Sequence, residues 1–126
     1  MTPSPTYLID LSACDLSRAI HQRQVSCHEV MQATLAQVDR FNPSSNAIVS
    51  RVDTEALLRQ AQECDAQLAR GESMGWMHGM PQAIKDLANV QGLRTSLGSP
   101  LMKDVVAAED GLMAQRMKAS GAIVIG

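Results

Sequence analysis

The sequence predicts an α/β fold, because segments with the periodicity of helices alternate with short apolar runs typical of strands. Polar residues suited to helix N-caps precede the helical stripes at Ser12, Ser26 and Asp53. Residues 122–125 are uniformly apolar, the pattern of a strand that is buried on both faces. A buried strand normally has neighbours on both sides, so we expect a sheet that is incomplete within this chain.

The first part of the chain is predicted to be mainly helical. Residues 1–10 contain two prolines and are expected to lie extended on the surface. Ser12 is followed three residues later by an acid, which marks a helix start, and this helix is expected to end near Gln24. Ser26 repeats the signature with a glutamate, and the second helix is expected to stop before Pro43.

The remaining elements alternate between strand and helix patterns. They are a strand over residues 47–52, a helix from Asp53 or Thr54 to Gly71, a strand over 81–84, a helix from Asp110 to Gly121 and a strand over 122–125. With 45% apolar residues among 126, the chain can form the core of one domain at most.

Composition and charge argue against a nucleic-acid or membrane partner. The formal net charge is −2 and no basic cluster occurs, so no attraction to nucleic acid or an anionic bilayer is expected. Aromatic residues make up only 2% of the chain, too few for platforms that stack single-stranded bases. The N-terminus lacks the pattern of a signal peptide, and no apolar run reaches membrane-spanning length, so a cytoplasmic protein is expected.

The cysteines and histidines form no pattern of a disulfide framework or a metal site. Cys14, Cys27 and Cys64 are widely spaced and odd in number, so we expect small, buried, reduced thiols. The histidines are scattered and lack the CxxC or HExxH spacing of metal ligands, so neither a metal nor a cofactor is expected. These histidines are His21, His28 and His78.

Lys85 is the candidate catalytic residue. It lies in an apolar, proline-led run, GMPQAIKD, over residues 79–86, a setting that suits a buried amine working as a base or nucleophile. The alternative is a lysine at the end of a strand that reaches solvent, which spacing alone favours. Ser96 and Ser99 are near enough in sequence to suggest a Ser–Lys dyad, but no GxSxG motif occurs and turn roles are preferred.

From Ser12 to Gly126 the chain resembles the N-terminal part of the amidase-signature hydrolases. Two stretches carry most of the resemblance, MHGMPQAIKDLANVQGLRTSLGSP over residues 77–100 and the run that starts at Asp110. Departures from the family pattern are mild and occur at Met80, Met117 and Ser120. The matching positions are His78, Gly79, Pro81, Ile84, Lys85, Asp86, Gly92, Thr95, Gly98, Ser99, Asp110, Arg116, Gly121, Ala122 and Gly126.

The resemblance implies a fold and a chemistry. The fold would be the N-terminal part of the amidase-signature fold, helices followed by strands of a mixed sheet, with residues 1–126 as a fragment of that domain. The family hydrolyses amide C–N bonds of small molecules with a Ser–cis-Ser–Lys triad, and its lysine falls on Lys85. The two serines and the oxyanion loop of the family would lie beyond Gly126, so this chain is expected to be catalytically incomplete alone.

Two other functions remain open at this point. The chain could be a non-catalytic module that forms a homo-oligomer through its exposed sheet edge. It could also be a complete small enzyme that uses Lys85 with Ser96 or Ser99, although no oxyanion hole is evident for it.

Overall fold

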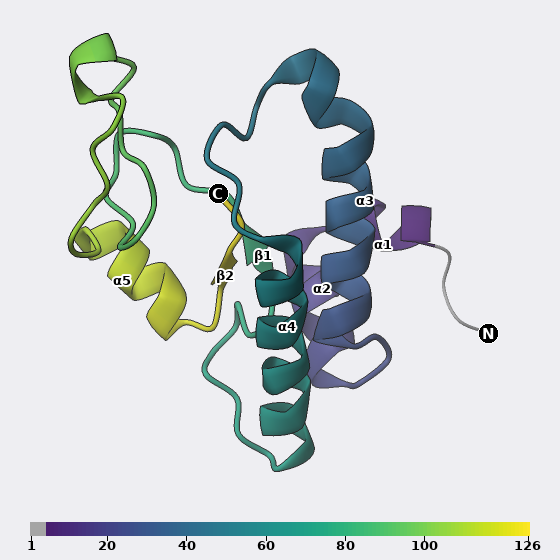
Figure 1. Cartoon of the computed structure of the whole chain (residues 1–126). Coiled ribbons are helices and arrows are strands. Elements are labelled where there is room, and N and C mark those ends of the chain that lie inside the picture. The colour runs from purple at the N-terminus through teal and green to yellow at the C-terminus, as the bar shows by residue number, and fades with distance from the viewer. Residues whose placement is uncertain (1–4) are drawn as a thin grey trace.

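The computed structural model describes residues 5–126 of the chain (Figure 1). The helices are α1 (Pro5–Asp10), α2 (Ala13–His21), α3 (Cys27–Ser45), α4 (Thr54–Ala69) and α5 (Leu112–Ala119). The strands are β1 (Pro81–Gln82) and β2 (Ile123–Val124), and η1 (Pro100–Met102) is a short 3-10 helix. Helices followed by strands of a small sheet are the predicted α/β arrangement.

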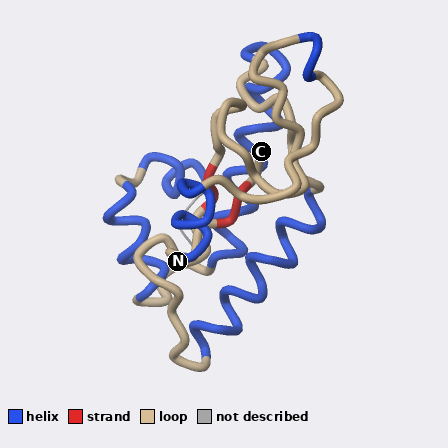
Figure 2. The backbone as a smooth tube through the Cα atoms, turned by 90° about the vertical axis from the view of Figure 1, so that its left-hand side faces the viewer, coloured by secondary structure: helices blue, strands red, loops and turns tan. Residues whose placement is uncertain are grey.

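The two strands pair in parallel between a helical part and a loop-rich part. Pro81 is opposite Ile123, and Gln82 is opposite Val124. In Figure 1 the pair lies between α3 and α4 on one side and α5 with its neighbouring loops on the other, and Figure 2 shows the same division from a second direction. Within residues 5–126 the sheet has these two strands, so it is incomplete as expected.

The predicted strand over residues 122–125 is reduced to the two residues of β2, but all four residues are buried, so the expected burial on both faces is confirmed. Ile123 and Ile125 join the larger apolar cluster, which the helices α1 to α4 form, and Val124 joins a smaller one with Val90 and Ala114. Since side chains alternate along a strand, β2 separates the two clusters and belongs to both.

Helix α3 begins with a complete capping box. The Ser26 side chain accepts a hydrogen bond from the Glu29 N–H, and the Glu29 carboxylate accepts one from the Ser26 N–H. Asp65 on α4 adds a cap from a neighbouring helix, because its carboxylate accepts from the N–H groups of Cys27 at 2.7 Å and His28 at 3.1 Å. These bonds pair the free amides of the first turn and fix α3 against α4.

The predicted helix starts at Ser12 and Asp53 are also confirmed, since both side chains accept a hydrogen bond from the backbone three residues on. Gly71 ends α4 as expected, with a φ of 76°. Helix α5 starts at Leu112 after Gly111, later than predicted. Asp110 is engaged elsewhere, because its carboxylate accepts from the Gln91 N–H and from the Lys118 amine.

Two predictions near the N-terminus are wrong. Residues 5–10 are helical rather than extended, while residues 1–4 lie outside the described part of the chain. Pro5 is the first residue of α1, a position whose N–H has no partner within the helix, so proline loses no hydrogen bond there. Leu8 of the same helix is buried in the core. Helix α2 ends at His21 rather than near Gln24.

Pro43 does not stop α3, which continues to Ser45. The proline lies in the last turn, so it removes one backbone hydrogen bond rather than interrupting a long ladder. The Asn42 side chain exchanges two hydrogen bonds with the backbone of Ile48, at 2.8 and 3.0 Å, and Asn46 ends the helix in the left-handed conformation. These contacts stabilise the turn beyond the proline.

Residues 47–52 do not form the predicted strand. Only the N–H of Val52 reaches the sheet, where it donates to the carbonyl of Ile125 at 3.0 Å. The predicted strand over residues 81–84 is likewise reduced to the two residues of β1. No helix within residues 5–126 is both long and apolar enough to cross a membrane.

We predict that Gly121→Ala destabilises the fold much more than Gly92→Ala. Both glycines have positive φ, 98° and 80°, so both substitutions strain the backbone. A Cβ at position 121 would lie 2.5 Å from the Cα of His78, whereas nothing lies within 4 Å of one at position 92. Chemical denaturation should give losses in the free energy of unfolding of about 2–4 kcal/mol and about 1 kcal/mol respectively. Equal losses would contradict this close packing.

Candidate active site

The backbone around Lys85 is held on both sides. The N–H of Ile84 donates to the carbonyl of Gly126 at 2.9 Å, which ties the chain to the end of β2. The Lys85 carbonyl accepts from the N–H groups of Leu87 at 2.7 Å and Ala88 at 3.0 Å, which closes a tight turn. The residue therefore lies where a parallel pair ends and a loop begins, a usual place for functional side chains in α/β folds.

The Lys85 side chain is exposed, which agrees with the alternative of a strand-end lysine that reaches solvent, favoured by spacing alone, and not with the buried amine that its apolar neighbours indicated. Ile84 takes the apolar role instead and packs against the smaller core cluster. Within residues 5–126, no hydrogen bond or ion pair holds the Lys85 amine. The amine is thus free to meet a further group.

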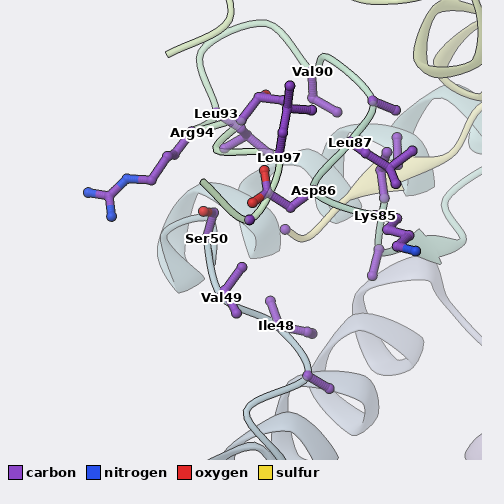
Figure 3. A pocket seen from close by; sticks show the side chains of 17 residues that line it. Ile48, Val49, Ser50, Lys85, Asp86, Leu87, Val90, Leu93, Arg94 and Leu97 are labelled. Carbon is purple, nitrogen blue, oxygen red and sulfur yellow. The ribbon is translucent and has the colours of Figure 1, made fainter. Parts of the chain in front are cut away.

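Lys85 and Asp86 line an open groove of about 640 Å³ (Figure 3). Its walls come from residues 47–50, 83–88, 90, 93–95 and 97–98, with Gly126 two residues beyond β2. The two charged side chains diverge in Figure 3, and Arg94 extends away from the other lining residues. Most of the lining side chains are aliphatic, so the groove offers an apolar surface beside the charges of Lys85, Asp86 and Arg94.

Asp86 closes the loop that follows Lys85. Its carboxylate accepts from the Ser96 N–H at 2.7 Å and forms a short hydrogen bond with the Ser96 hydroxyl. These two hydrogen bonds hold the pKa of Asp86 below its ordinary value, and the bond from the Ser96 hydroxyl has the larger effect. An ionised carboxylate therefore joins residue 86 to residue 96.

The two candidate serines have turn roles, which confirms the preferred interpretation. The Ser96 hydroxyl is engaged with Asp86, and the Ser99 hydroxyl accepts from the Leu101 N–H at 3.3 Å as the N-cap of η1. Neither is hydrogen-bonded to Lys85 in the described structure.

The buried histidine has a structural role. His78 is 0% exposed, and its Nδ1 accepts from the Met74 N–H at 3.1 Å while its Nε2 lies 2.8 Å from the Cys64 carbonyl. A carbonyl can only accept, so Nε2 carries the proton. His21 contacts the Ser17 carbonyl at 2.7 Å and the Ser73 hydroxyl at 2.9 Å. These two histidines thus anchor loops and helices to one another.

The cysteines are free thiols, as expected, but their burial differs. Cys27 and Cys64 are buried, and burial is the largest cause of their raised pKa values. Cys14 is exposed, which corrects the expectation for that residue. No group of three or more histidine, cysteine, aspartate or glutamate side chains in the described residues is placed to hold a metal ion.

The model of the amidase family matches residues 29–126. The chain belongs to the amidase family. It is 36% identical over 116 residues to an acylamidase of Rhodococcus erythropolis, covering 92% of this chain and 24% of that protein. It is 35% identical over 112 residues to a glutamyl-tRNA(Gln) amidotransferase component of Methylococcus capsulatus, covering 89% of this chain and 23% of that one.

The structural similarity agrees with this assignment. A solved fatty acid amide hydrolase superposes with a TM-score of 0.86 at 23% identity, covering 99% of this chain and 22% of that chain, and so shows the same fold. The resemblance to amidase-signature hydrolases is thereby confirmed. This amidase-family chain spans about a quarter of the length of the curated relatives that it matches.

The role of Ser96 as a partner of Asp86 was not foreseen. The turn signal in the sequence, a glycine at position 98 between two serines, indicated only that the chain reverses there. A bond between residues ten positions apart leaves no periodic pattern, so sequence reasoning could place the turn but not its anchor.

We predict that Asp86 makes the stability of the chain depend on pH. Because its folded-state pKa is lowered, its stabilising effect is present above the unfolded-state pKa and is lost as pH falls through the folded value. The free energy of unfolding of Asp86→Asn should therefore fall below that of the wild type at neutral pH, and the gap should shrink below about pH 4. Asp104→Asn, in an exposed position, is the control. A gap for Asp86→Asn that does not change with pH would contradict the prediction.

Proposed function

We propose that this chain contributes Lys85 to an amide-hydrolysing site whose nucleophilic and bridging serines come from residues outside these 126. The observation that carries the proposal is a lysine whose backbone is hydrogen-bonded on both sides while its amine is free at the edge of an apolar groove. Membership of the amidase family and the position of Lys85 in the family motif support it. The acylamidase relative supports amides as the substrate class.

The chemistry follows the Ser–cis-Ser–Lys mechanism that the family resemblance implies. The uncharged Lys85 amine accepts a proton from the bridging serine, which in turn accepts one from the nucleophilic serine. The nucleophile then attacks the amide carbon, backbone N–H groups stabilise the oxyanion, and the C–N bond breaks as the amine leaves with a proton. Water releases the acyl group by the reverse path of proton transfers. Further residues that covered the groove would desolvate the amine and favour its uncharged form.

The alternative of a complete small enzyme has little support. It requires Ser96 or Ser99 to serve Lys85, yet the first is bound to Asp86 and the second caps η1. The names of the two curated relatives both refer to amide groups but indicate different substrates. The proposal therefore covers amide C–N bonds as a class.

We predict that the purified chain alone does not hydrolyse simple aryl or aliphatic amides, because the proposal takes both serines of the triad from residues outside these 126. A chimera in which it replaces the matching segment of the Rhodococcus acylamidase tests the role of the lysine directly. In an active chimera, Lys85→Ala should lower kcat/KM by about 10²–10⁴-fold, the usual contribution of a general base. Lys103→Ala, at an exposed lysine of the same loop-rich part, is the matched control and should change little.

Two results would contradict the proposal. One is turnover by the isolated chain that Lys85→Ala abolishes, which would favour the complete small enzyme. The other is a chimera that retains its activity after Lys85→Ala.

We also propose that the isolated chain forms a homo-oligomer through its open sheet edge, a non-catalytic association. Both outer edges of the β1–β2 pair lack a third strand within residues 5–126, and large apolar side chains such as Leu101, which is 96% exposed, lie uncovered. We predict a two-fold dimer as the simplest closed assembly. Size exclusion with light scattering should give a dimer mass that persists on dilution. A monodisperse monomer at high concentration would contradict the prediction.

A further inference from the structure

A strained turn faces Asp86. The N–H of Ser99 donates to the carbonyl of Ser96 at 2.9 Å, and the two central residues, Leu97 and Gly98, have φ values of 54° and 69°. Positive φ at both central positions is the geometry of a type I′ turn, in which asparagine, aspartate or glycine normally occupies the first position. Leucine is unfavourable there because its Cβ crowds the backbone, so other contacts must stabilise the turn.

Asp86 supplies those contacts. Its two carboxylate oxygens engage the N–H and the hydroxyl of Ser96, and the Gly98 N–H donates to that same hydroxyl at 3.3 Å. The Ser96 hydroxyl thus passes the hold of the carboxylate on to the Gly98 N–H inside the turn. The carboxylate thus favours the left-handed turn over other backbone conformations of residues 96–99.

The same carboxylate belongs to the residue next to Lys85. On the other side of Lys85, Ile84 is bonded to Gly126 at the end of β2. Residue 85 is therefore held between the sheet and the turn, and only its side chain is free. The turn at 96–99 and the lysine are linked through a single side chain, that of Asp86.

We infer that Asp86 is a positioning residue for Lys85, holding the backbone of residue 85 in one place by fastening it to the turn at residues 96–99. A long, flexible side chain reaches a defined point only if its backbone is fixed, and misplacement by about 1 Å can lower a rate by about a hundredfold. The catalytic meaning of this role rests on the proposed function, whereas the positional role can be measured in the chain itself.

The test uses pairs of nitroxide spin labels on the full chain. Cys14 is exposed, whereas Cys27 and Cys64 are buried, so Cys14 is the native cysteine open to labelling. The substitution Lys85→Cys adds a second exposed thiol, and labels on residues 14 and 85 form the first pair. Distance distributions are compared before and after Asp86→Ala, with Asp104→Ala as the control substitution. A second pair, Cys14 with Arg59→Cys on α4, reports on the fold as a whole.

With Asp86→Ala, the distance distribution between labels on residues 14 and 85 should become about twice as wide, while that between residues 14 and 59 should not change. Asp104→Ala should change neither distribution. Amide exchange at Ser96 should also accelerate by about tenfold. An unchanged residue 85 pair would overturn the inference, because the backbone would then be fixed without Asp86. Equal broadening of both pairs would also overturn it, since Asp86 would then order the native fold as a whole rather than residue 85 in particular.

If Asp86→Ala does not give folded protein, Ser96→Ala replaces it. That variant removes the hydroxyl donor and keeps the N–H, so it should broaden the residue 85 pair by a smaller amount, and no broadening overturns the inference. These readouts involve no catalysis. A failure of the chimera assay would therefore reject the amidase role of Lys85 and leave the positional result standing. A failure of the distance measurement would reject the positioning role of Asp86 and leave the chimera result standing.

Discussion

A parallel backbone ladder between residues 79–84 and 121–126 holds the two parts of the chain together. Gly79 donates to Gly121 at 2.9 Å, Ile123 to Met80 at 2.9 Å and Ile125 to Gln82 at 3.0 Å. Because the ladder joins segments about forty residues apart, both apolar clusters depend on it, and so does the turn that carries Lys85. The absence of a side chain at Gly121 allows the close approach to His78 from which the ladder starts.

Features that depend on neighbouring residues could be predicted from the sequence. The Ser26 capping box is a local arrangement, and the structure contains both of its hydrogen bonds. The burial of residues 122–125 around β2 could be predicted because four consecutive apolar residues have no amphipathic alternative. Residues 47–52 have similar composition, yet a strand also needs a partner along its length, and Val52 alone finds one. Strand composition is thus a weaker guide than helix capping, as expected from the dependence of strands on their neighbours.

The candidate site shows the same difference between features set by neighbouring residues and features that need a distant partner. Lys85 could be singled out from its motif, because the residues that flank it are contiguous in sequence. Spacing alone also favoured an exposed amine, whereas the apolar residues beside Lys85 indicated a buried one, because burial depends on what covers the groove rather than on those neighbours. Carboxylates also act at long range, among them Asp65 on the first turn of α3 and Asp86 on the turn at 96–99. Each comes from a segment distant in sequence, so no local pattern could predict its contacts.

Amide hydrogen exchange, measured residue by residue on the chain, tests most directly whether the ladder is the constraint on which the fold depends. The amides of Gly79, Ile123 and Ile125 should exchange as slowly as those in the middle of α3 and α4, and the Ile84 amide, next to Lys85, should be protected with them. Ladder amides that exchange as fast as those of exposed loops, while α3 and α4 remain protected, would contradict it. The helices would then fold without the strands, and Lys85 would have no fixed position.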